Sequence, residues 1–71
     1  MTLATKIRDK IATGVLPRHD PPKLWVGKGN GRPCDGCDSP ITDVENEFDT
    51  INGSVLRFHP ACYHIWDVER A

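Results

Sequence analysis

The sequence has no long apolar run. No segment approaches the roughly 20 apolar residues of a transmembrane helix, and residues 1–17 lack the apolar stretch and cleavage site of a secretory signal. We therefore expect a cytoplasmic protein without a membrane partner. Aromatic residues are few among the 71, with two Trp, one Tyr and two Phe, which suits one small core.

Cysteine is also scarce, and its odd count excludes a complete disulfide framework. The three cysteines are Cys34, Cys37 and Cys62, so at least one thiol would remain unpaired. In a reducing cytoplasm, paired cysteines more often indicate a metal site than a disulfide. Domains below about 70–80 residues commonly need a metal, a disulfide or a partner for stability. The sequence therefore favours a metal.

A histidine completes a four-ligand pattern. Cys34 and Cys37 are separated by two residues, as are His59 and Cys62, and 21 residues lie between the pairs. Three thiolates and one imidazole fill a tetrahedral Zn²⁺ shell and leave no position for water. The pattern predicts one structural zinc ion and a protein that is not an enzyme. His64 would face away from the ion if His59 caps a helix that carries Cys62.

We expect one small α+β domain over residues 1–71, in three parts. These are an N-terminal helix in 1–16, a Pro- and Gly-rich loop in 17–33 and a zinc module in 34–71. The zinc module would consist of a zinc knuckle (residues 34–37), a β-hairpin and a C-terminal helix. Zinc would stabilise the whole domain.

The N-terminal helix is predicted from a four-residue apolar spacing. Thr2 is a suitable N-cap, and Gly14 can take the left-handed position after the helix, with Val15 as its hydrophobic contact. The apolar stripe consists of Leu3, Ile7 and Ile11.

The 17–33 loop contains four Pro and three Gly, so we expect neither a helix nor a long strand. Trp25 is expected to pack onto the rest of the fold, because a fully exposed Trp is unusual. The GKGNG segment is similar to a phosphate-binding loop, but it lacks the expected preceding strand and following helix. His19, in the same loop, is not expected to bind the metal.

The β-hairpin is predicted from Asn-Gly at 52–53. A three-residue loop at 51–53, with its glycine in a left-handed bulge, pairs Thr50 with Ser54. The same register places Phe48 opposite Leu56 and Glu47 opposite Arg57. The apolar face would then carry Val44, Phe48, Leu56 and Phe58.

The C-terminal helix is predicted to begin at Pro60, a favoured first helical residue. Residues spaced three and four apart along this helix form one side that can face the core. That side carries Cys62, Ile65, Trp66 and Glu69.

Charge is unevenly divided along the chain. Residues 1–32 have a net charge of +5 and residues 33–71 a net charge of −6. The basic half can contact an anionic partner, or the two halves can pack against each other. A nucleic-acid module would use the basic segment 18–32, although the acidic zinc half opposes it. The residues concerned are Lys23, Lys28 and Arg32, beside Trp25.

The ligand spacing resembles the first zinc site of a LIM domain, and the order of knuckle, hairpin and helix resembles treble-clef zinc modules. A LIM domain would place two further cysteines where this chain has Ile65 and Val68, so its second zinc site is missing. The layout, with GVLP, RPCDGC and LRFHPACYHIW, also resembles small bacterial zinc-binding proteins. The last resemblance implies a metal site and a soluble bacterial protein, and it brings no known activity.

A protein-binding or regulatory adaptor is the function we expect. Zinc would supply a rigid frame, and the N-terminal helix and Trp25 would supply the binding surface. The alternative is a nucleic-acid-binding zinc module that uses residues 18–32.

Overall fold

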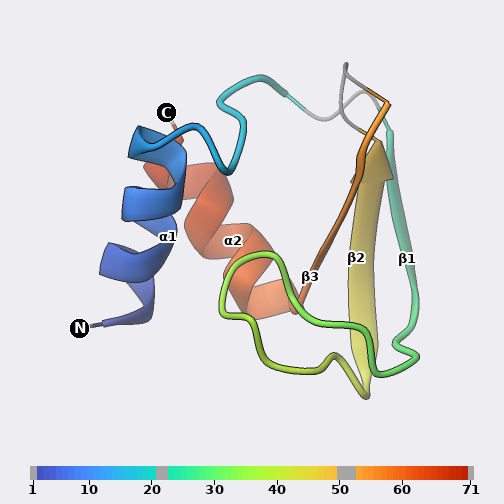
Figure 1. Cartoon of the computed structure of the whole chain (residues 1–71). Coiled ribbons are helices and arrows are strands. Elements are labelled where there is room, and N and C mark those ends of the chain that lie inside the picture. The colour runs from blue at the N-terminus through green and yellow to red at the C-terminus, as the bar shows by residue number, and fades with distance from the viewer. Residues whose placement is uncertain (1, 21–22, 50–52, 71) are drawn as a thin grey trace.

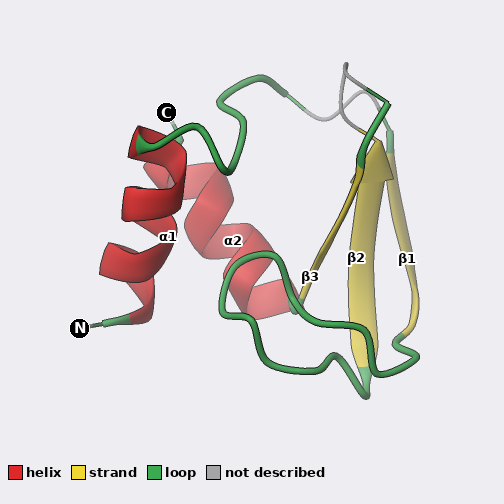
Figure 2. Ribbon diagram, viewed as in Figure 1, coloured by secondary structure: helices red, strands yellow, loops and turns green. Residues whose placement is uncertain are grey.

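The fold combines two helices with a three-stranded antiparallel sheet (Figures 1 and 2). The computed structural model describes residues 2–20, 23–49 and 53–70. None of the helices in these ranges is long and apolar enough to cross a membrane. In chain order the elements are α1 (Leu3–Ala12), β1 (Leu24–Lys28), β2 (Val44–Asp49), β3 (Val55–Phe58) and α2 (Pro60–Glu69).

Helix α1 begins and ends near the predicted residues. The Thr2 hydroxyl accepts a hydrogen bond from the Thr5 backbone N–H at 3.2 Å, and Gly14 has φ of +83°. The predicted contact of Val15 is wrong, since this side chain is 64% exposed. Leu16 is buried instead, because the turn at Gly14 directs the second residue after it, and not the first, toward the core.

Strand β1 lies inside the segment expected to be a loop. It pairs along β2 from Leu24 opposite Phe48 to Lys28 opposite Val44. Leucine, tryptophan and valine in succession suit a strand, and the prolines of this segment all lie outside it. The predicted hairpin is therefore part of a three-stranded sheet.

Trp25 is more exposed than expected for a residue that packs onto the rest of the fold. Its side chain is 43% exposed, and Lys23 Nζ lies 5.1 Å from its ring centroid. The backbone of this residue pairs opposite Glu47 of β2. The aromatic side chain is consequently part of the molecular surface.

The predicted hairpin register is confirmed. Phe48 pairs with Leu56 and Glu47 with Arg57, and Gly53 has φ of +84°. The predicted pairing of Thr50 with Ser54, and the turn residues 51 and 52, involve positions outside the described residues.

One position on the predicted apolar face is not buried. Phe48, Leu56 and Phe58 belong to the core, but Val44 is exposed. Val44 pairs with Lys28 of the outer strand β1, whereas α2 packs against β2 and β3 and does not contact β1. The apolar face therefore continues beyond the area that the helices cover.

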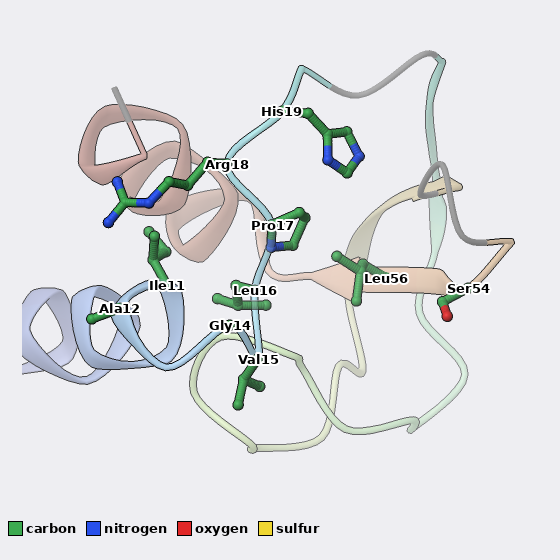
Figure 3. Close-up of a pocket in the computed structure, with 10 residues that line it drawn as sticks. All are labelled: Ile11, Ala12, Gly14, Val15, Leu16, Pro17, Arg18, His19, Ser54 and Leu56. Carbon is green, nitrogen blue, oxygen red and sulfur yellow. The ribbon is translucent and has the colours of Figure 1, made fainter.

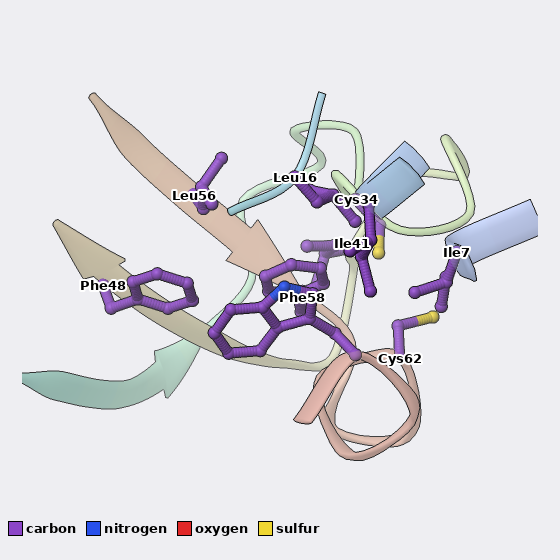
Figure 4. Close-up of a cluster of buried hydrophobic side chains, with 10 residues drawn as sticks. Ile7, Leu16, Cys34, Ile41, Phe48, Leu56, Phe58 and Cys62 are labelled. Atoms are coloured by element: carbon purple, nitrogen blue, oxygen red, sulfur yellow. The ribbon is translucent and has the colours of Figure 1, made fainter. Parts of the chain in front are cut away.

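The core lies between the sheet and the two helices, which pack against each other (Figure 1). Trp66 of α2 stacks on Phe48 at 5.0 Å and on Phe58 at 5.7 Å between ring centroids. Its Nε1 atom donates a hydrogen bond to the carbonyl oxygen of Pro17 at 2.9 Å. The buried cluster, most of which Figure 4 labels, consists of Ile7, Ile11, Leu16, Cys34, Ile41, Phe48, Leu56, Phe58, Cys62 and Trp66.

The basic and acidic halves of the chain pack against each other. Lys6 and Lys10 form ion pairs with Asp38 at 2.9 and 2.8 Å, and Arg8 pairs with Glu69 at 3.1 Å. The charged residues of α1 thus contact acidic groups of the second half.

Candidate metal centre

The four predicted ligand residues lie together. Cys34 and Cys37 belong to the loop between β1 and β2, while His59 is the N-cap of α2 and Cys62 lies in its first turn. One ligand atom from each residue lies within 4.8 Å of all the others. The group can bind one metal ion.

The interatomic distances fit a tetrahedral metal shell. His59 Nδ1 lies 3.4 Å from Cys37 Sγ and 3.9 Å from Cys62 Sγ. Zinc bonds of about 2.3 Å to sulfur and about 2.0 Å to nitrogen place such atoms roughly 3.5 Å apart in a tetrahedron. These two distances and the donor set are therefore compatible with one bound metal ion.

A backbone carbonyl fixes the His59 ring. The Nε2 atom lies 3.1 Å from the carbonyl oxygen of Pro40. A carbonyl oxygen only accepts hydrogen bonds, so Nε2 carries the proton and Nδ1 presents its lone pair to the thiols. Nothing in the sequence distinguishes Pro40 for this role, because every residue has a carbonyl group.

The knuckle holds its two cysteines through backbone hydrogen bonds. The Gly36 N–H donates to Cys34 Sγ at 3.3 Å, and the Asp38 N–H donates to the Cys34 carbonyl at 2.8 Å. Asp38 has φ of +69°, a left-handed conformation that Asp tolerates better than most residues. These bonds turn the chain so that the thiols of Cys34 and Cys37 reach one point.

Two lysines of α1 bind the knuckle backbone. Lys6 Nζ donates to the Cys37 carbonyl at 3.0 Å, and Lys10 Nζ donates to the Asp35 carbonyl at 2.9 Å. Three thiolates around Zn²⁺ have a net charge of −1, which nearby ammonium groups stabilise. These contacts were not predicted from the sequence, although the four-residue spacing of the lysines places them on one helix face.

The thiols differ in acidity. Burial raises the pKa of Cys62, and the neighbouring Cys34 raises it further. Burial also raises the pKa of Cys37, but hydrogen bonds from the Ser39 backbone and from the neighbouring thiols lower it to about 7. A bound cation would favour the thiolate form at all three cysteines.

The other two histidines lie outside the cluster. His64 is exposed on α2. His19 lines a separate groove of about 610 Å³ between the segment after α1 and strand β3 (Figure 3). Neither residue belongs to the group of four ligand atoms.

The GKGNG segment, residues 27–31, begins within strand β1, and two of its glycine amides already have partners. The Gly29 N–H donates to the Asp43 carbonyl at 2.6 Å, and the Gly31 N–H donates to the Ile41 carbonyl at 2.8 Å. A phosphate-binding loop needs such N–H groups free to point at the ligand. These contacts argue against a phosphate site.

No protein-family model, curated protein or solved structure gives a significant match to this chain.

Proposed function

We propose that Cys34, Cys37, His59 and Cys62 bind one structural Zn²⁺ in a treble-clef-like module. The observation that carries this proposal is the convergence of three Sγ atoms and one imidazole nitrogen within 4.8 Å. Structural zinc commonly contributes about 10 kcal/mol or more to folding. Here the ion would join the knuckle to the start of α2.

The ion would have no catalytic role. Four protein ligands complete the tetrahedral shell of Zn²⁺, so no position remains for a water molecule or a substrate. We therefore propose that zinc maintains the shape of the domain. The function of the domain would then be to bind another protein.

The sheet offers a more suitable binding surface than α1. Ile7 and Ile11 of the apolar stripe are buried, so α1 cannot offer them to a partner without leaving the core. Leu24, Trp25 and Val26 of β1 are exposed. An adaptor built on this zinc frame would use these residues.

A nucleic-acid module is the second candidate, supported by Trp25 with Lys23 beside it. Against this function, Lys6, Arg8 and Lys10 pair with acidic groups of the same chain. Titration of the zinc-loaded protein with labelled single- and double-stranded oligonucleotides at two salt concentrations tests this candidate. We expect little binding at physiological salt, whereas sub-micromolar, salt-dependent binding that Lys28→Glu abolishes would support it.

Removal of zinc tests the structural proposal. A strong chelator should unfold the sheet and α2, because the cluster would then leave three thiols in a core too small to remain folded. Zinc should restore the native amide spectrum. A chelated chain that keeps this spectrum would show that the metal, if bound, is not structural.

A further inference from the structure

The two edges of the sheet differ in how they are covered. The outer edge of β3 is closed by the knuckle: the Arg57 N–H donates to Asp35 Oδ2 at 2.7 Å, and the Asp35 N–H donates to the Arg57 carbonyl at 2.8 Å. Strand β1 forms the opposite edge, and within residues 2–20, 23–49 and 53–70 it contacts no helix or strand except β2 (Figure 1). Its outer edge is open.

The phase of the β1–β2 ladder shows which backbone groups face outward. The Gly29 N–H donates to the Asp43 carbonyl, and the same register pairs Gly27 with Glu45. Hydrogen-bonded and non-hydrogen-bonded pairs alternate in an antiparallel ladder. Every second residue of β1 therefore directs its backbone N–H and C=O away from β2, namely Leu24, Val26 and Lys28.

The side chains of this edge are also available. All five residues of β1 are exposed, including Leu24 at 38% and Val26 at 66%. Leu24 lies beside Phe48 on the sheet face that forms the core, so the apolar surface extends outward from the core to the edge. An edge strand with exposed apolar residues and no cover is unusual, because it invites pairing with another chain.

The charges around β1 select the kind of strand that can pair with it. Residues 21–34 contain Lys23, Lys28 and Arg32 but no Asp or Glu. Two copies of β1 paired antiparallel about Val26 would place lysines of both copies at each end of the ladder, which opposes self-association. An acidic strand would instead meet a positive charge at each end.

We propose that the outer edge of β1 binds an extended acidic segment of another protein, which adds to the sheet as a fourth strand. This proposal rests on the protein-binding function proposed above. Backbone hydrogen bonds to Leu24, Val26 and Lys28 supply affinity, while alternating apolar side chains pack beside Leu24 and Val26. Acidic side chains at the two ends of the bound segment lie near Lys23 and Lys28.

The probe is a synthetic eight-residue peptide, Thr-Glu-Thr-Val-Thr-Val-Glu-Thr, called the Val and Glu peptide. Paired antiparallel to β1, it places Val opposite Leu24 and Val26 and Glu opposite Lys23 and Lys28. It is added to the whole zinc-loaded, ¹⁵N-labelled chain. We expect the largest amide shifts, and the greatest slowing of hydrogen exchange, at Leu24, Val26 and Lys28. A matched Val and Lys peptide should bind at least about tenfold more weakly, because its charges repel those of the edge. Absence of shifts with the Val and Glu peptide at millimolar concentration would overturn the proposal.

The decisive variant is Val26→Pro. Proline removes an N–H that β2 does not use, and edge strands tolerate it at such positions. We expect zinc content and the amide signals of β3 and α2 to be preserved, with peptide affinity reduced roughly tenfold or more. Val26→Thr, which keeps the N–H, should bind within about threefold of the original chain. Equal binding by a folded Val26→Pro variant would overturn the proposal.

A second measurement keeps the test valid if Val26→Pro does not fold. A Val and Glu peptide N-methylated at alternate residues lacks the N–H groups of one edge, and two such peptides cover both phases. At least one should lose binding to the unaltered chain, and equal binding by both would exclude strand addition.

If instead an oligonucleotide, and not the peptide, shifts the β1 amides, the nucleic-acid candidate replaces the proposal. Failure of peptide binding to a zinc-loaded, folded chain overturns the edge proposal alone, whereas failure to bind zinc overturns the structural metal proposal.

Discussion

Gly36 of the knuckle lies directly against Cys62 of α2. A Cβ atom at Gly36 would stand 3.1 Å from Cys62 Cβ and 3.3 Å from Phe58 Cδ1. Gly36→Ala should therefore destabilise the zinc-loaded protein by about 1–3 kcal/mol, as overpacking of a core does. Urea unfolding measures the loss. Gly27→Ala is the control, because nothing lies within 4 Å of its added Cβ, and an equal loss in both variants would contradict this packing.

The ion pairs between α1 and the knuckle can be tested by titration. Hydrogen bonds from Lys10 and then from Lys6 hold the pKa of Asp38 below its ordinary value of 3.8. Because the folded pKa is lowered, the stabilisation is present above the unfolded pKa and is lost as pH falls through the folded pKa. Lys10→Met should raise the pKa of Asp38, as measured by carboxyl ¹³C NMR. An unchanged pKa would show that the contact does not persist in solution.

Ile7 tests whether α1 belongs to the core. Its side chain is fully buried, so Ile7→Ala should cost about 2–5 kcal/mol of unfolding free energy. Leu3→Ala on the same helix is the matched control, because Leu3 is partly exposed and should cost clearly less. Equal unfolding midpoints for the two variants in urea would indicate that α1 is not docked.

Several features of the fold could be predicted because they depend on local geometry. The Asn-Gly turn and the pairing of charged and apolar residues were enough to predict Phe48 opposite Leu56. Pro60 and the spacing of His59 and Cys62 similarly predicted where α2 begins. These signals act within a few residues along the chain.

Features that depend on distant residues were missed. Strand β1 exists because the free edge of β2 accepts Leu24–Lys28, which overrides the many glycines and prolines nearby. The contact between Lys6 and the Cys37 carbonyl also joins segments far apart in sequence. The grouping of the four candidate ligands was predicted from their spacing, but the carbonyl of Pro40 that orients His59 was not.

The histidines provide a prediction with an internal control. His59→Ala should reduce zinc affinity by orders of magnitude, because it removes the Nδ1 ligand. His64→Ala should leave zinc affinity unchanged and alter the unfolding free energy by no more than about 0.5 kcal/mol, since His64 is exposed on the same helix. Competition with a chromogenic chelator gives the zinc affinity of each variant, and urea unfolding gives its stability. A greater loss of zinc affinity in His64→Ala than in His59→Ala would show that His64 is the ligand.

The most direct test of the zinc centre is the metal content and coordination of the full-length chain purified without added metal. Elemental analysis should find one zinc atom per chain. X-ray absorption should find a shell of three sulfur atoms and one nitrogen atom, as expected from the donor set of Cys34, Cys37, His59 and Cys62. A folded chain free of metal, or a zinc shell with fewer sulfur ligands, would contradict the account.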